Sequence, residues 1–375
     1  MKINILLANN FFNDHCSYGF VYPIIKSINL IKESGIQINF IYSTKKNIFD
    51  CNILIIESRF YKGIEKKKFI NYLKKNKKKK LKIIFADTAD NSGQIQREFL
   101  TFADTYWKGQ IIKDKKKYLK AHYGGRLFTD FYKKKFNIKD KKIQLSNPIK
   151  NINLLKKIKV CWNMGLCDHG SFAHIKQKLF SIFKSKFFIN NSNNFFSPSI
   201  ERKLNLSCRI GINYERETVQ FQREKISNLL RNHTETSKIS RFKYLNEIKI
   251  SKFVISPFGW GELCPRDFET FIYGAILIKP DMKTIDTWPD WYISKKTYLS
   301  LKWDFSDFKD QIDFAINNYN KLIKLGINAQ KKYLFYTTSE KSKQIFAEQI
   351  VQLGVDKIDF SGFSPILDGI SKAII

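Results

Sequence analysis

A glycine-rich loop followed by charged side chains at helical spacing is the stretch of this sequence best suited to chemistry. Gly259 and Gly261 follow a short apolar run, and Pro265 with the acidic residue two positions later is typical of a helix start. Arg266 and Glu269 are three residues apart, which places both side chains on one face of that helix. A helix N-terminus binds anions through its free N–H groups, and an arginine adds a bidentate phosphate donor. The stretch therefore predicts a nucleotide diphosphate site, with Arg266 on the phosphates and Glu269 on ribose hydroxyls.

Apolar strands alternate with helical stretches along the first half of the chain, and this alternation predicts a parallel, doubly wound sheet. The predicted strands cover residues 3–8, 36–42, 53–57 and 83–86. Polar loops at 9–18 and 87–93 follow two of these strands. Because such sheets bind ligands at the carboxyl ends of their strands, His15 and Asp87 are the candidates for a catalytic base.

A second series of strands and helices is predicted after a linker at residues 145–154. Its strands are expected at 158–163, 207–213, 252–256 and 275–278, and its helices at 215–232, 244–250, 303–325 and 339–353. We therefore place one domain at residues 1–152 and a second at 153–335. Residues 336–375 are expected to form a C-terminal helical segment that braces the first domain.

The stretch from Ser256 to Pro280 resembles the donor-site signature of GT-B glycosyltransferases, in particular their bacterial exostosin-like, family 1-like branch. In that signature a glycine-rich loop precedes Arg-x-x-Glu, a glycine and a buried strand. The matching segments here are Gly259-Trp-Gly261, Arg266-Asp-Phe-Glu269, Gly274 and Ile276-Leu-Ile278. The close match covers about a tenth of the chain. It implies an α/β fold with two Rossmann-like domains facing across a cleft, the first on the acceptor side and the second binding the donor.

The same resemblance implies which residues contact the donor. They are Asn163, Gly165, Gly259, Gly261, Glu262, Arg266 and Glu269. Many GT-B enzymes carry two glutamates with seven residues between them, and this sequence departs from that pattern. Gly261 stands where the first glutamate is expected, and Glu262 follows one residue late.

The resemblance implies transfer of a sugar from a nucleotide-diphosphate sugar to a surface-glycan acceptor of the lipopolysaccharide, capsule or O-antigen type. No Asp-x-Asp motif stands near the predicted donor site. We therefore expect a metal-independent enzyme without a cofactor, in which positive protein groups stabilise the departing diphosphate. Two alternatives stay open: a nucleotide-sugar epimerase of the same architecture, and a basic nucleic-acid- or membrane-binding protein with a degenerate nucleotide site.

The chain is strongly basic, with a net charge of +32, and residues 1–150 contribute +20 of it through 32 Lys and Arg against 12 Asp and Glu. Lysines cluster at 66–68, 74–80, 115–117 and 133–135. One interpretation is compositional bias that leaves the lysines solvated. The other is attachment of the Lys66 to Lys82 region to an anionic surface, a membrane or an acidic acceptor. No nucleic-acid-binding motif is present, so nucleic acid is not an expected partner.

The sequence also bears on location. No apolar run has the length of a membrane span, and the N-terminal apolar run is too short for a signal peptide and is expected to be the first strand. The six cysteines lack paired metal-ligand spacing and are expected to be reduced thiols. We expect a cytoplasmic protein, with peripheral attachment to the inner face of the membrane as one consequence of the lysine clusters.

Overall fold

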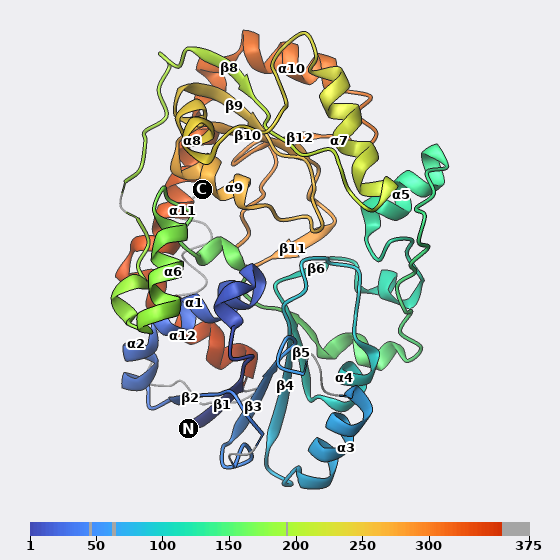
Figure 1. Ribbon diagram of the computed structural model, residues 1–375, viewed down its shortest axis with the longest axis vertical. Coiled ribbons are helices and arrows are strands. Elements are labelled where there is room, and N and C mark those ends of the chain that lie inside the picture. The colour runs from blue at the N-terminus through green and yellow to red at the C-terminus, as the bar shows by residue number, and fades with distance from the viewer. Residues whose placement is uncertain (45–46, 62–64, 193, 355–375) are drawn as a thin grey trace.

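The computed structural model describes residues 1–44, 47–61, 65–192 and 194–354. A six-stranded parallel sheet, in the lower half of Figure 1, is built by the first part of the chain in the order β2-β1-β3-β4-β5-β7. Its strands are β1 (Lys2–Leu6), β2 (Gln37–Ile41), β3 (Ile53–Glu57), β4 (Lys82–Asp87), β5 (Thr105–Lys108) and β7 (Ile158–Val160).

This sheet is apolar on both faces because helices cover both. In β3, Ile53 and Ile55 pack in one core while Leu54 and Ile56 pack in the other, since successive strand side chains point to opposite faces. The helices α1 and α2 supply the first core, and α3 and α4 the second. The helices of this part are α1 (His15–Lys26), α2 (Ile28–Glu33), α3 (Lys66–Asn76), α4 (Arg97–Phe102) and α5 (Leu127–Phe136).

A second parallel sheet of four strands, in the upper half of Figure 1, has the order β12-β10-β9-β8. Its strands are β8 (Leu204–Ser207), β9 (Ser251–Ile255), β10 (Ile276–Pro280) and β12 (Leu299–Leu301). The helices are α6 (Ala173–Phe183), α7 (Glu217–Leu229), α8 (Arg241–Ile250), α9 (Pro265–Ile272), α10 (Phe308–Asn317) and α11 (Tyr319–Thr338). Two parallel α/β sheets facing each other confirm the predicted GT-B-type fold class.

Two further elements connect the sheets. Strand β6 (Gln110–Ile112) pairs antiparallel with β11 (Ile285–Thr287), one strand from each part of the chain. Helix α12 (Glu340–Gly354) returns to the first sheet, where Phe346 packs on Trp162 with 4.8 Å between ring centroids. Residues 355–375 of the predicted bracing segment lie outside the described residues, and the division into domains stays a prediction.

The structure corrects three local predictions. Strand β7 does not open the second series; it pairs with β5 at the edge of the first sheet, beyond the boundary predicted at 152/153. The strand expected at 207–213 is β8 and ends at Ser207, so the residues after it form a loop. The polar loop expected at 9–18 ends at Asp14, whose carboxylate accepts hydrogen bonds from two free N–H groups and thereby starts α1 early.

Within the described part of the chain all six cysteines are free thiols, and four of them are buried. The described residues contain no cluster of His, Cys, Asp and Glu arranged to hold a metal ion. None of the helices described is both long and apolar enough to cross a bilayer.

Candidate active site

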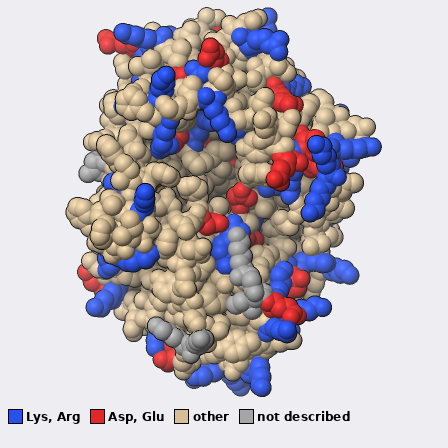
Figure 2. Space-filling model, in the orientation of Figure 1, with Lys and Arg blue, Asp and Glu red and all other residues tan. Residues whose placement is uncertain are grey.

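A large cavity opens where β8 and β9 end, beside the N-terminus of α9, and we call it the basic cavity. Its volume of about 1060 Å³ is enough for a nucleotide-sized ligand. Figure 2 shows a hollow in the upper half of this face with Lys and Arg gathered beside it. Among the described lining residues the only carboxylate is Glu215. The cations are Arg209, Arg223, Lys238, Arg241 and Arg266.

Arg223 and Arg266 are held by neutral oxygen atoms. Arg223 is only 6% exposed and donates from Nε to the carbonyl oxygen of Phe258 and from Nη1 to that of Gly211, both at 2.9 Å. Arg266 donates from Nε to the Tyr244 hydroxyl at 3.3 Å and from Nη2 to the Arg209 carbonyl oxygen. No described carboxylate forms an ion pair with either one. Burial lowers the pKa of Arg223, as expected where a cation lacks a compensating negative charge.

The other two arginines of the cavity differ, because each already has a carboxylate. Arg209 pairs with Glu247 at 2.7 Å, and side-chain hydrogen bonds to that carboxylate raise the arginine's pKa. Arg241 pairs with Glu269 at 2.7 Å. Among the four arginines of the basic cavity, Arg223 and Arg266 are therefore the two without a described carboxylate partner, and the exposed Lys238 adds to their positive charge.

Two aromatic rings form one wall of the basic cavity. Tyr214 and Trp260 lie 5.3 Å apart between centroids, and Trp260 is 38% exposed. The guanidinium of Arg223 lies 4.9 Å from the Tyr214 ring centroid, and that of Arg216 lies 5.6 Å from the Trp260 centroid. An exposed ring beside cations is suited to a planar base linked to phosphate.

A smaller cavity of about 270 Å³ lies between α1, α6 and α9, and we call it the histidine cavity. His15, the first residue of α1, is exposed at its rim, as is His174. His169 is buried against Phe268, its Nε2 lies 2.8 Å from the Met164 carbonyl oxygen, and burial lowers its pKa. Of the two predicted base candidates, His15 is therefore the one that lines the histidine cavity and is also exposed to solvent.

Arg266 and Glu269, predicted to share one ligand-facing side of a helix, line different cavities. Arg266 faces the basic cavity and Glu269 the histidine cavity, while Arg241 lines both. Tyr244 connects them: its hydroxyl accepts from Arg266 and also contacts Glu269. Burial and the Glu269 carboxylate raise the pKa of Tyr244, so that hydroxyl stays protonated. The two cavities adjoin at this chain of polar groups.

Two predicted donor residues instead contact the first sheet. A Cβ on Gly261 would lie 1.7 Å from the Asp90 carbonyl oxygen, so the glycine permits main chain to touch main chain. Glu262 is buried and accepts hydrogen bonds from Ser92, at 2.6 Å from its hydroxyl and 3.1 Å from its N–H. Burial raises the pKa of Glu262. This contact holds the loop after β9 against the loop that follows β4.

The remaining predicted donor glycines and Asn163 differ in their surroundings. A Cβ on Gly259 would have its nearest neighbour, the Tyr214 hydroxyl, at 3.7 Å, in ordinary contact next to the basic cavity. Gly165 is tightly packed, since a Cβ there would lie 2.6 Å from Phe268. Asn163 accepts from the Gly165 N–H at 2.9 Å and donates to the Gly109 carbonyl oxygen at 3.1 Å. Gly165 and Asn163 thus fit a role in packing, while Gly259 stays near the candidate site.

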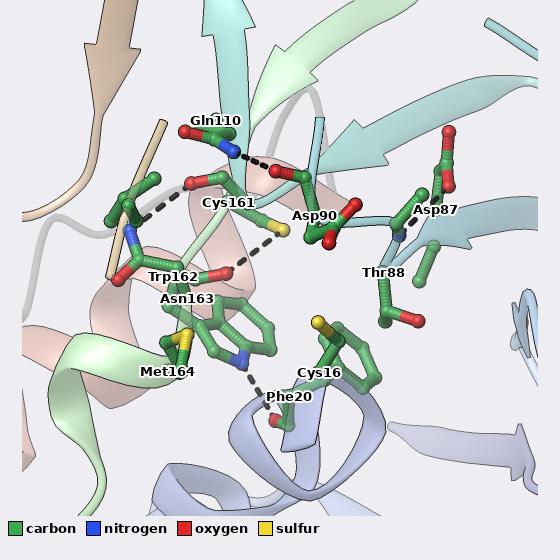
Figure 3. Close-up of a pocket in the computed structure, with 14 residues that line it drawn as sticks. Cys16, Phe20, Asp87, Thr88, Asp90, Gln110, Cys161, Trp162, Asn163 and Met164 are labelled. Carbon is green, nitrogen blue, oxygen red and sulfur yellow. Dashed lines mark hydrogen bonds between the residues drawn. The ribbon is translucent and has the colours of Figure 1, made fainter. Parts of the chain in front are cut away.

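Asp87, the second base candidate, lies at the edge of a third cavity (Figure 3). Its Oδ2 accepts hydrogen bonds from the Tyr106 hydroxyl at 2.5 Å and from the Lys108 ammonium at 3.0 Å, and all three side chains are buried. The cavity has a volume of about 50 Å³, which is room for a water molecule or two and not for a sugar. The ion pair with Lys108 is therefore enough to account for a carboxylate buried at this position.

The same cavity contains two thiols whose sulfur atoms point toward its hollow in Figure 3. Burial raises the pKa of Cys16 to about 12 and raises that of Cys161 as well. Both thiols are therefore protonated near neutral pH, and a protonated thiol is a poor nucleophile.

Several residues of the basic cavity were not predicted. Arg209 was hidden inside the strand expected at 207–213, although it follows β8 at the edge where ligands bind. Arg241 begins α8 and showed no motif of its own. Arg126 lies outside the basic cavity, where it donates to the Trp260 and Gly124 carbonyl oxygens between the two parts of the chain.

Comparisons with known proteins give no family. No protein-family model matches the chain, and no curated protein matches it. Among solved structures, an α-glucosyltransferase in complex with UDP and a 13-mer DNA is 9% identical, with 94% of this chain and 99% of that chain covered and a TM-score of 0.41. HepE of Anabaena in complex with UDP-glucose is 10% identical, with 94% and 100% covered and a TM-score of 0.42. Sucrose-phosphate synthase from Thermosynechococcus elongatus is 9% identical, with 94% and 99% covered and a TM-score of 0.43. Likenesses of this strength carry no weight in assigning chemistry to this chain.

Proposed function

We propose that this protein is a glycosyltransferase whose basic cavity binds the diphosphate of a nucleotide-sugar donor. The observation that carries the proposal is the pair Arg223 and Arg266, two cations with neutral partners only, lining one cavity at the carboxyl ends of parallel strands. Holding uncompensated charge in a protein is costly, and a bound anion removes that cost. A diphosphate supplies the negative charge, and Tyr214 and Trp260 supply a wall for the base.

The chemistry follows from the positions of these charges. An acceptor hydroxyl oxygen forms a bond to the anomeric carbon of the donor sugar, the bond from that carbon to the diphosphate oxygen breaks, and its electron pair leaves with the diphosphate. Arg223 and Arg266 stabilise the negative charge that develops there. Glu269, across Tyr244, accepts hydrogen bonds from hydroxyl groups of the donor. In this proposal no metal ion takes part.

The proton of the acceptor hydroxyl goes to His15, at the rim of the histidine cavity. Histidine is the side chain that acts most often as a general base in enzymes. We further propose that the acceptor is a glycan or glycolipid of the surface-polysaccharide type. The histidine cavity, open at His15 and His174, is where it would enter.

A thermal-shift panel of nucleoside diphosphates tests the proposal. A ligand that binds only the folded protein, present at about a hundred times its Kd, stabilises it by about 2.7 kcal/mol. At least one nucleoside diphosphate should raise the unfolding temperature of the parent. Arg266→Gln should lose most of that shift, because a charge-assisted contact contributes about 1.5–3 kcal/mol, or about ten- to a hundredfold in affinity.

The matched control is Arg231→Gln, an exposed arginine whose guanidinium contacts Asn228. It should keep the full shift. Arg266→Lys keeps the charge but not the planar fork, so it should bind more weakly than the parent and better than Arg266→Gln. If Arg266→Gln unfolds like the parent without ligand and keeps the diphosphate shift, Arg266 has no part in donor binding.

A further inference from the structure

Helix α6 carries a row of large apolar side chains on its exposed side. Phe180 is its one fully buried side chain, packed beside Phe11 and Tyr18. The large apolar residues along the other side of the helix stay open to solvent. They are Phe172 (61% exposed), Ile175 (54%), Ile182 (61%) and Phe183 (64%), with Phe187 (75%) in the turn that follows. A helix in a water-soluble surface normally buries such a stripe.

We call this row of apolar side chains the α6 patch. The charged side chains of the surrounding segment are all positive. Residues 169–200 contain four lysines and no Asp or Glu. Lys178, Lys184 and Lys186 are exposed, and Lys176 pairs with Asp168, which lies outside that range. In Figure 2 the surface over α6, at the left edge, is mostly tan with blue beside it. Phenylalanine and isoleucine on one side with lysines at the rim are the features of a helix that lies in a membrane interface.

We infer that the α6 patch docks the protein on a membrane surface rich in anionic lipid. The apolar side chains enter the headgroup region while the lysines attract phosphate groups. An identical copy is a poor occupant, since a two-fold dimer through this patch would bring the lysines of both copies together. This inference does not depend on the chemistry of the donor site.

The lysine cluster of α3, which the sequence singled out for membrane attachment, differs from α6. Its apolar residues Phe69, Ile70 and Leu73 face the core, so its exposed side consists mostly of lysines such as Lys67 and Lys74, with the ring of Tyr72 37% exposed beside them. Contacts made by exposed charges alone are screened by salt. Helix α6 offers a row of exposed apolar side chains together with lysines, whereas α3 offers mainly lysines.

Docking through α6 places the histidine cavity next to the lipid. Ala173, His174 and Gln177 of α6 line that cavity, and Lys184 lies 3.5 Å from the centroid of the Phe12 ring before α1. An acceptor held in the membrane by a lipid would thereby reach His15 without leaving the bilayer surface. The α6 patch thus adds a partner of defined chemistry to the proposed function.

The test is flotation of the full chain with vesicles of phosphatidylcholine alone or of phosphatidylcholine with phosphatidylglycerol. We expect binding to the anionic vesicles that weakens with salt. Phe183→Ser/Phe187→Ser should weaken it by about tenfold or more, because buried aromatic side chains contribute most of the insertion energy. Phe242→Ser is the matched control, since Phe242 is also 75% exposed but lies on α8. It should bind like the parent.

Lys67→Gln/Lys74→Gln compares the two lysine surfaces and should reduce binding less than the α6 variant does. Equal binding of the parent and Phe183→Ser/Phe187→Ser overturns the inference, as does a parent that binds neither vesicle. A parent that is dimeric without lipid, and monomeric with the α6 substitutions, shows that a second copy covers the patch. Diphosphate binding is measured on the same samples, so failure at α6 is distinguishable from failure of the donor site.

Discussion

The loop between β9 and α9, residues 256–264, has two sides that differ in how their polar groups are satisfied. On the side of the first sheet, Glu262 accepts two hydrogen bonds from Ser92, and the main chain at Gly261 touches that of Asp90. On the side of the basic cavity, Arg223 and the adjoining Arg266 have only neutral partners. On the first side the polar groups named have their hydrogen-bond partners within the protein. On the second side two cations have no negatively charged partner among the described residues.

This difference shows that one short motif serves two purposes. Gly261 and Glu262 belong to the same glycine-rich stretch as Gly259 and Arg266, yet they hold the two sheets together. Only the second pair adjoins the basic cavity. A residue's place in a motif therefore does not determine whether it touches a ligand, and the predictions below separate the two roles.

Gly261→Ala should have the largest effect, and on stability. The new Cβ would lie 1.7 Å from the Asp90 carbonyl oxygen, so two main-chain segments must move apart. Overpacking costs about 1–3 kcal/mol and occasionally more, and a clash this severe between main-chain segments puts Gly261→Ala at or above the upper end of that range. Gly259→Ala, with its nearest neighbour at 3.7 Å, should unfold close to the parent. Urea unfolding of both variants measures the contrast, and equal midpoints would show that the loop contact is not tight.

Glu262→Ala should have a smaller effect, because it leaves the Ser92 hydroxyl and N–H without their acceptor. We expect a loss of about 1–3 kcal/mol in the free energy of unfolding, with diphosphate affinity nearly unchanged. A lower free energy of unfolding with an unchanged diphosphate affinity would assign Glu262 to the contact with the first sheet. A large drop in affinity at unchanged stability would instead place Glu262 in the donor site.

The pH dependence of the same contact gives the smallest effect. Burial raises the pKa of Glu262 in the folded protein, so the folded state holds this proton more tightly than the unfolded state does. The associated stability is present below the ordinary glutamate pKa and is lost as pH rises toward the raised value. The parent should therefore lose stability relative to Glu262→Gln over that window. If the free energies of unfolding of the parent and of Glu262→Gln change in parallel with pH, the raised pKa of Glu262 is contradicted.

Most of the fold could be predicted, because its strands are short apolar runs with clear ends. The run Ile53 to Glu57 and the strand before Pro280 appear where the sequence predicted them. Strand β7 was assigned to the wrong sheet, since nothing in three residues tells which neighbour they pair with. The early start of α1 at Asp14 depends on a side chain that also fits a loop.

The site could be predicted only in part. Arg266 lies in the first turn of a helix whose start could be predicted from the neighbouring residues, because Pro265 and the capping carboxylate of Asp267 are typical of a helix N-terminus. The role of Glu262 depends on Ser92, 170 residues away, and no local pattern reveals such a contact. The pairing of Glu269 with Arg241 is likewise a property of the folded chain, and it moves that carboxylate into a different cavity from Arg266.

Calorimetric titration with a nucleoside diphosphate and its monophosphate tests the central claim most directly, that Arg223 and Arg266 bind the donor diphosphate. The parent should bind the diphosphate at least about tenfold more tightly, since the second phosphate adds charge-assisted hydrogen bonds. In Arg223→Gln/Arg266→Gln that preference should fall to near unity, while Arg231→Gln keeps it. A parent without preference for the diphosphate, or a double variant that folds and retains the full preference, would contradict the account.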